Sequence, residues 1–115
     1  MNYKIFRILL VAYMLLILSV SSIPGQYLPK ASLLTWDKLI HLIEYFILGI
    51  LVMKSMNQVS SKMLFYVIPF GIIFGIIDEY LQSFISGRYS SGWDVLADTI
   101  GVAIGALLVL ENRNE

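Results

Sequence analysis

The stretch Gly71-Ile-Ile-Phe-Gly-Ile-Ile-Asp-Glu-Tyr-Leu-Gln82 decides the fold, because it ends a long apolar run with two adjacent acids. Uncharged residues extend from Met63 to Ile77, a pattern typical of a helix inside a membrane. A helix turns by about 100° per residue, which places five of these residues on one stripe: Gly71, Gly75, Asp78, Glu79 and Gln82. Carboxylates inside a membrane are costly, so their presence indicates a function.

The composition predicts an all-α, polytopic membrane protein with a single domain over residues 1–115. The chain is 58% hydrophobic and 14% charged, and its mean hydropathy is +0.80, so the lipid bilayer is its expected partner. The balance of 8 Lys and Arg against 8 Asp and Glu, without a basic cluster, argues against nucleic-acid binding. Without cysteine, the chain has no disulfide, thiolate nucleophile or cysteine metal site. The oligomeric state stays open.

Four transmembrane helices are expected, at about 5–23, 36–54, 62–84 and 93–110. The first follows Lys4 and Arg7 and ends before Pro24-Gly25. It could instead be a cleaved signal peptide, but an uncleaved helix is favoured because the rest of the chain is itself membrane-like.

The second and fourth helices repeat the polar stripe. Asp37, His41, Glu44 and Tyr45 follow helical spacing on one face, although His41 and Glu44 could instead face an aqueous loop. On the fourth helix the stripe continues into glycines, with four positions on one face: Asp94, Asp98, Gly101 and Gly105. The pairs Gly71/Gly75 and Gly101/Gly105 predict contact between the third and fourth helices, and Gly49 is expected to tolerate a larger side chain better than they do.

The distribution of basic residues predicts that both termini are cytoplasmic. Five basic residues lie on the side of the termini: Lys4, Arg7, Lys54, Lys62 and Arg113. Three lie on the other side: Lys30, Lys38 and Arg88. The start of the second helix, the end of the third and the start of the fourth are then on the outer side.

At that outer end the sequence predicts an acidic cavity. Six carboxylates would share it with Lys38, His41 and Arg88: Asp37, Glu44, Asp78, Glu79, Asp94 and Asp98. So many negative charges cannot all stay ionised at low dielectric. Some must bind protons, pair closely or hold a cation.

Three motifs resemble a known family. They are Asp37-Lys38-x-x-His41-x-x-x-Tyr45, Asp78-Glu79-x-x-Gln82-x-Phe84-x-x-Gly87-Arg88 and Asp94-x-x-x-Asp98-x-x-Gly101-x-x-x-Gly105. This pattern resembles the VanZ-like family of small bacterial membrane proteins, whose founding member is associated with resistance to the antibiotic teicoplanin. The resemblance implies a multi-pass protein of the bacterial cytoplasmic membrane that acts in the cell envelope. Two positions depart from the family pattern, since Ser86 replaces a common Pro and Asp98 a common Asn.

The first functional hypothesis is an intramembrane enzyme that acts on a lipid-linked or amphiphilic envelope molecule. His41, Asp78 or Glu79 would transfer protons, and Asp37 would orient His41. Substrate binding would fall to seven further residues, with Arg88 holding an anionic group: Lys38, Glu44, Tyr45, Gln82, Arg88, Asp94 and Asp98. No cofactor is identified, but His41, Asp78 and Glu79 are candidate ligands for a divalent cation.

Two other hypotheses remain. A non-catalytic binder could alter how a glycopeptide or another envelope ligand meets the outer leaflet, and this needs only the pocket. Ion or proton movement would use the carboxylates, but the cytoplasmic half of the helices lacks matching polar residues, so it ranks last.

Overall fold

The computed structural model describes residues 3–24, 37–56, 60–85 and 92–112. These residues form helices and no strand, with the following bounds: α1 Tyr3–Ser21, α2 Asp37–Lys54, the short 3-10 turn η3 Ser61–Met63, α3 Leu64–Gln82 and α4 Gly92–Glu111. The prediction of an all-helical chain with four long helices is therefore confirmed.

Three segments are long and apolar enough to cross a membrane: α1, the continuous stretch Ser61–Gln82 and α4. The chain is therefore a membrane protein. Helix α2 has a comparable length, but it carries four charged residues: Asp37, Lys38, Glu44 and Lys54. A fourth crossing by α2 stays a prediction, and so does the orientation of the termini.

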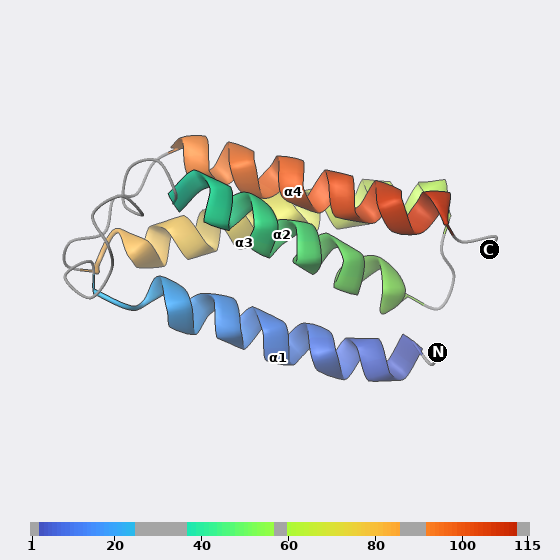
Figure 1. Cartoon of the computed structure of the whole chain (residues 1–115), viewed down its shortest axis with the longest axis horizontal. Coiled ribbons are helices and arrows are strands. Elements are labelled where there is room, and N and C mark those ends of the chain that lie inside the picture. Colours follow the sequence, from blue (N-terminus) through green and yellow to red (C-terminus); the bar gives the residue numbers. More distant parts are fainter. Residues whose placement is uncertain (1–2, 25–36, 57–59, 86–91, 113–115) are drawn as a thin grey trace.

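The helices run up and down along the long axis of the molecule (Figure 1). The end of α1, the start of α2, the end of α3 and the start of α4 lie at one end, which we call the polar end. The chain termini lie at the opposite end (Figure 1). Helices α2 and α4 run in the same direction and make the most extensive contact between helices in the described part of the chain.

Glycines allow α2 and α4 to approach with their backbones in contact. A Cβ at Gly105 would collide with the carbonyl oxygen of Phe46 on α2, and one at Gly101 would lie 2.5 Å from the carbonyl oxygen of Leu42. In the reverse direction, a Cβ at Gly49 would collide with the backbone of Val102. No side chain fits at these positions unless the two helices separate.

Helix α3 also packs on α4, but through its own glycines. A Cβ at Gly71 would lie 2.8 Å from a methyl group of Val102, and one at Gly75 would lie 3.0 Å from Asp98 Oδ2. Contact between α3 and α4 was therefore predicted correctly, whereas the partner of Gly101 and Gly105 was not. Those two glycines face α2, and the expectation that Gly49 tolerates a larger side chain is wrong for the same reason.

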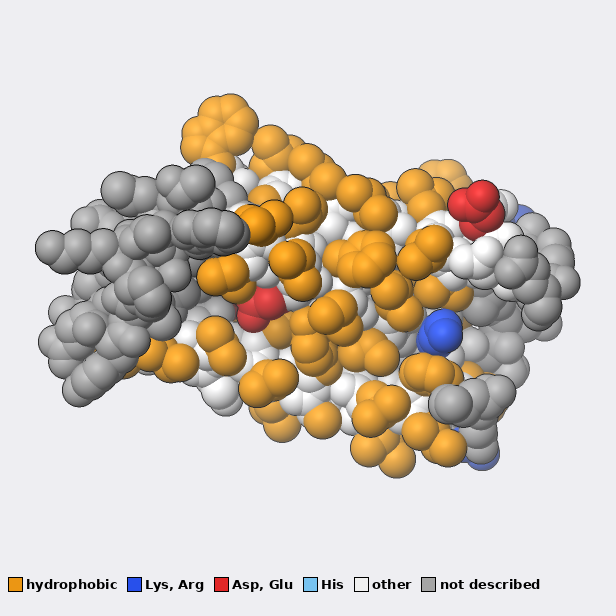
Figure 2. Space-filling model, in the orientation of Figure 1, with side chains coloured by type: hydrophobic (Ala, Val, Ile, Leu, Met, Phe, Trp, Pro, Cys, Tyr) orange, Lys and Arg blue, Asp and Glu red, His pale blue; other side chains and the backbone are white. Residues whose placement is uncertain are grey.

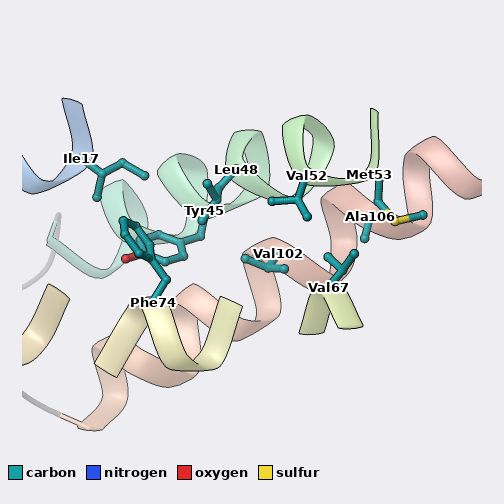
Figure 3. Packing of buried hydrophobic residues seen from close by; sticks show 9 residues of the cluster. All are labelled: Ile17, Tyr45, Leu48, Val52, Met53, Val67, Phe74, Val102 and Ala106. Carbon is teal, nitrogen blue, oxygen red and sulfur yellow. The ribbon is translucent and has the colours of Figure 1, made fainter. Parts of the chain in front are cut away.

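The middle of the bundle is filled by apolar side chains from all four helices (Figure 3): Ile17, Tyr45, Leu48, Val52, Met53, Val67, Phe74, Val102 and Ala106. Two hydrogen bonds fix helix α1 to the α2 region, one near the middle of both helices and one at the end near the termini. Tyr13 donates a hydrogen bond of 2.8 Å to the carbonyl oxygen of Glu44, and Arg7 Nε donates one of 2.9 Å to the carbonyl oxygen of Ser55.

Apolar side chains predominate on the described part of the face of the bundle that Figure 2 shows. Many large ones are exposed, among them Phe65 at 81% and Ile8 at 71%. In water such a surface would drive aggregation, whereas lipid tails solvate it without cost.

Candidate functional site

Polar side chains from three helices are buried together at the polar end. His41 comes from α2, Asp78, Glu79 and Gln82 from α3, and Asp94 and Asp98 from α4. Each is at most 5% exposed, and Asp78 and Asp98 are fully buried. Each helix places its polar residues on the face that its neighbours cover, which continues the stripes seen in the sequence.

His41 lies between two carboxylates. Its Nδ1 is 2.7 Å from Asp98 Oδ1, which is a short hydrogen bond, and its Nε2 is 3.8 Å from Glu79 Oε1. The imidazole thus connects all three helices of the site. One nitrogen is held firmly by Asp98, while the other faces Glu79 at a distance that a small movement would close.

Tyr45 supports the same cluster from the next turn of α2. Its hydroxyl donates a hydrogen bond of 2.9 Å to Asp78 Oδ2. Its ring is stacked on the His41 ring, with centroids 6.2 Å apart and planes 12° apart, and it also contacts Phe74. Tyr45 therefore limits the rotation of both Asp78 and His41.

Several buried polar atoms in the cluster have no hydrogen-bond partner among the residues that the structure describes. Among them are Asp78 Oδ1, Asp98 Oδ2 and both polar atoms of the Gln82 amide. Buried polar atoms in folded proteins are normally satisfied. Each of these residues is therefore equipped to bind a ligand.

Two sets of three residues bring potential metal-binding atoms within 4.8 Å of one another. One set is His41, Asp78 and Asp98, and the other is His41, Glu79 and Asp94. The set expected from the sequence, His41 with Asp78 and Glu79, combines members of both. The structure instead pairs each acid of α3 with an acid of α4.

The other predicted site residues fall outside this cluster or outside the described part of the chain. Glu44 is half-buried and belongs to neither set of potential ligands. The side chains of Asp37 and Lys38 and the whole of Arg88 lie outside what the structure describes. The sequence assigned the orientation of His41 to Asp37, whereas the observed partner of Nδ1 is Asp98.

A family model described as VanZ/LLP1 matches residues 4–111, nearly the whole chain. The chain belongs to the VanZ/LLP1 family. Searches of curated proteins and of solved structures found no match.

Membership of the VanZ/LLP1 family confirms the resemblance seen in the three motifs. The three motifs supply seven residues of the cluster that the structure assembles: His41, Tyr45, Asp78, Glu79, Gln82, Asp94 and Asp98. The family membership names no reaction, and the connection to teicoplanin comes from the family name alone. The function therefore has to be argued from the site.

Proposed function

We propose that this VanZ-like protein is an intramembrane enzyme that acts on a lipid-linked or amphiphilic molecule of the bacterial cell envelope. The observation that carries the proposal is the buried His41, whose two ring nitrogens each face a carboxylate. An imidazole held in this way transfers protons efficiently, because one carboxylate fixes its tautomer and stabilises its protonated form.

The proton-transfer chemistry follows from the positions of the two acids. With Nδ1–H donated to Asp98 Oδ1, the lone pair of His41 lies on Nε2, beside Glu79. Nε2 would accept a proton from a water molecule or a substrate hydroxyl, and Glu79 would donate or accept the second proton. Asp78, fixed by the Tyr45 hydroxyl, would hold the substrate.

The apolar surface around the cluster supports the proposal that the substrate is amphiphilic. Large apolar side chains are exposed near the polar end, on the three helices of the site and just after α3: Leu39, Ile43, Ile77, Tyr80, Phe84, Trp93 and Leu96. A molecule with its tail against this surface would have its polar group level with the buried acids. In this proposal Arg88, on the segment between α3 and α4, binds an anionic phosphate or carboxylate of that group.

Catalysis can be tested with the purified protein in lipid nanodiscs. A mixture of bacterial envelope lipids and lipid-linked precursors would be incubated with the protein, and products would be followed by mass spectrometry. We expect one lipid class to be converted, and His41→Gln to slow the conversion by about 100-fold or more. The control Glu111→Gln changes an exposed acid at the other end of α4. Conversion at equal rates by wild type and His41→Gln would contradict the proposal.

We place the site on the outer side of the cytoplasmic membrane, with both termini inside. Among the Lys and Arg residues of the described segments, Lys4, Arg7, Lys54 and Lys62 belong to the helix ends near the termini and Lys38 belongs to the start of α2 at the polar end. This excess near the termini supports the orientation. The chain has no cysteine, so single cysteines can be labelled cleanly. An impermeant thiol reagent should label Ser22→Cys in intact cells and spare Asn112→Cys. The reverse pattern would move the site to the cytoplasm.

A non-catalytic binder is the second candidate, favoured by exposed aromatic side chains near the polar end. Tyr80, Phe84 and Trp93 are 64%, 69% and 68% exposed, and the first two contact each other edge to face. Such rings could hold a glycopeptide at the outer leaflet. Calorimetric titration with teicoplanin should then show saturable binding that Trp93→Ala weakens, while no lipid is converted.

Ion or proton movement is the weakest candidate. Beyond the cluster, the centre of the bundle is apolar, with Leu48, Val52, Val67, Val102 and Ala106 across the path (Figure 3). In the described part of the chain, no charged side chain is buried at the end near the termini. A conducting path would need such groups or water there.

A further inference from the structure

We infer that the polar end binds one divalent transition-metal ion through His41, Asp78 and Asp98. One potential ligand atom from each residue lies within 4.8 Å of the other two. Two atoms bound to one ion at about 2.0–2.2 Å are separated by about 3 to 4.4 Å, depending on the angle between them. Small side-chain movements would therefore bring the three potential ligand atoms to the distances that one bound ion requires.

The carboxylate oxygens needed for this site are available. Asp78 Oδ1 and Asp98 Oδ2 have no hydrogen-bond partner among the described residues, although both side chains are fully buried. Leaving two carboxylate oxygens in a low-dielectric interior without partners is costly. A cation between them would satisfy both oxygens and offset their mutual repulsion.

The surroundings of the site also favour a ligand. Asp98 Oδ2 would be only 3.0 Å from a Cβ at position 75, so the glycine there makes room for this carboxylate against α3. One turn beyond Asp78, on the same buried face of α3, Gln82 is 1% exposed, and neither polar atom of its amide has a hydrogen-bond partner in the part of the chain that the structure describes. Its amide oxygen is a suitable fourth ligand.

The three ligands are already oriented by hydrogen bonds, as metal ligands in proteins usually are. Tyr45 holds Asp78 by the oxygen Oδ2 and leaves Oδ1 available. Both ring nitrogens of His41 face carboxylates, at 2.7 Å from Asp98 and 3.8 Å from Glu79. Whichever nitrogen binds the ion, the other can therefore donate its N–H to a carboxylate.

The choice of ion follows from the ligand chemistry. One imidazole with carboxylate and amide oxygens suits Mn²⁺ or Zn²⁺, whereas Mg²⁺ prefers oxygen ligands and keeps several waters. Four carboxylates are buried in the cluster, and His41 is the one basic side chain buried with them among the described residues. A divalent cation reduces this excess of negative charge.

The second set of three, His41 with Glu79 and Asp94, is the competing site. Asp94 lies in the first turn of α4, where a carboxylate stabilises the helix N-terminus without any ion. Asp78 and Asp98 are both 0% exposed, against 5% for Glu79 and 1% for Asp94, and neither has this role at a helix N-terminus, so we assign the ion to the set that contains them.

This inference deepens the proposed function and rests on it for the use of the ion, whereas ion binding itself requires no turnover. A bound ion would polarise a phosphate or activate a water molecule beside it. With an ion bound, His41 would serve as its ligand instead of accepting the proton itself, and the neighbouring Glu79 would take over the role of proton acceptor.

The test is calorimetric titration of chelator-treated protein, in nanodiscs without substrate, with Mn²⁺ and with Zn²⁺. We expect one ion per chain and a weakening of about 100-fold or more for Asp78→Asn and Asp98→Asn, since each removes a charged ligand. Tyr45→Phe keeps all ligands and should weaken binding by about 10-fold, because it removes an orienting hydrogen bond. The control Glu111→Gln should bind as wild type does, and circular dichroism would show that each variant is folded.

Three results would overturn the assignment. Absence of saturable binding would remove the ion altogether. Equal affinity for wild type and both Asp variants would show nonspecific binding to carboxylates. A larger loss for Glu79→Gln and Asp94→Asn than for Asp78→Asn and Asp98→Asn would move the ion to the competing site. Lipid conversion that persists at full rate in chelator would refute the use of the ion while leaving the proposed enzyme intact.

Discussion

The two ends of the α2–α4 pair are held together in opposite ways. At the polar end, the side chains of His41 and Asp98 connect the helices through a hydrogen bond of 2.7 Å. Toward the termini, Gly105 and Gly49 bring the two backbones into direct contact, with no polar side chain between them. Close packing stabilises the glycine end, whereas the buried charges destabilise the polar end. Buried charge that lowers stability is the usual sign of a functional site.

Removing one partner of the His41–Asp98 hydrogen bond at the polar end should lower the stability most. His41→Leu leaves the buried Asp98 without its hydrogen-bond partner and should lower the free energy of unfolding by about 3–5 kcal/mol. The double variant His41→Leu/Asp98→Leu should recover most of this loss, because it removes both polar groups. Melting temperatures in detergent would measure both. A double variant as unstable as His41→Leu would show that the cost comes from packing rather than charge.

Breaking the glycine end should have a somewhat smaller effect. Gly105→Ala puts a methyl group against the carbonyl oxygen of Phe46, so α2 and α4 must separate, at a cost of about 1–3 kcal/mol. Gly92→Ala is the matched control on the same helix, because no atom of the described residues lies within 4 Å of a Cβ there. Thermal unfolding of the two variants decides this point. Equal melting temperatures would contradict a close backbone contact.

A third prediction concerns the hydrogen bond from Tyr45 to Asp78, which orients one of the buried acids at the polar end. Tyr45→Phe deletes one hydroxyl and its hydrogen bond of 2.9 Å, with an expected loss of about 1–1.5 kcal/mol. Tyr66→Phe makes the same chemical change at a residue that is 68% exposed and should be nearly neutral. Chemical unfolding of both variants would measure the difference. If the two variants were equally stable, the Tyr45 hydroxyl would have no structural role.

The smallest effect is expected from Asp98→Asn. Asparagine keeps an oxygen that can accept the hydrogen bond from His41 and removes one of the buried negative charges, so the change in stability should be under about 1 kcal/mol in either direction. A loss comparable to that of His41→Leu would show that the charge of Asp98 stabilises the fold.

Much of the fold could be predicted because each helix carries its own periodic signal. The apolar run before Asp78 and the repeated stripes gave the number of helices and the depth of the polar residues. Pairing between helices could not be predicted in the same way. Glycines at this spacing indicate that another backbone packs closely against the helix. They do not identify the partner helix, because Gly101 and Gly105 have the same spacing whether they face α2 or α3.

The sequence by itself determined that this is a helical membrane protein of the VanZ/LLP1 family with buried acids and one histidine at the ends of its helices. Those properties depend on residue types and spacing along a single helix. Only the tertiary structure decided that His41 pairs with Asp98, that Tyr45 holds Asp78, and that each acid of α3 is matched with one of α4. These pairings depend on the rotation of each helix about its axis, which is fixed by packing against its neighbours and not by local sequence.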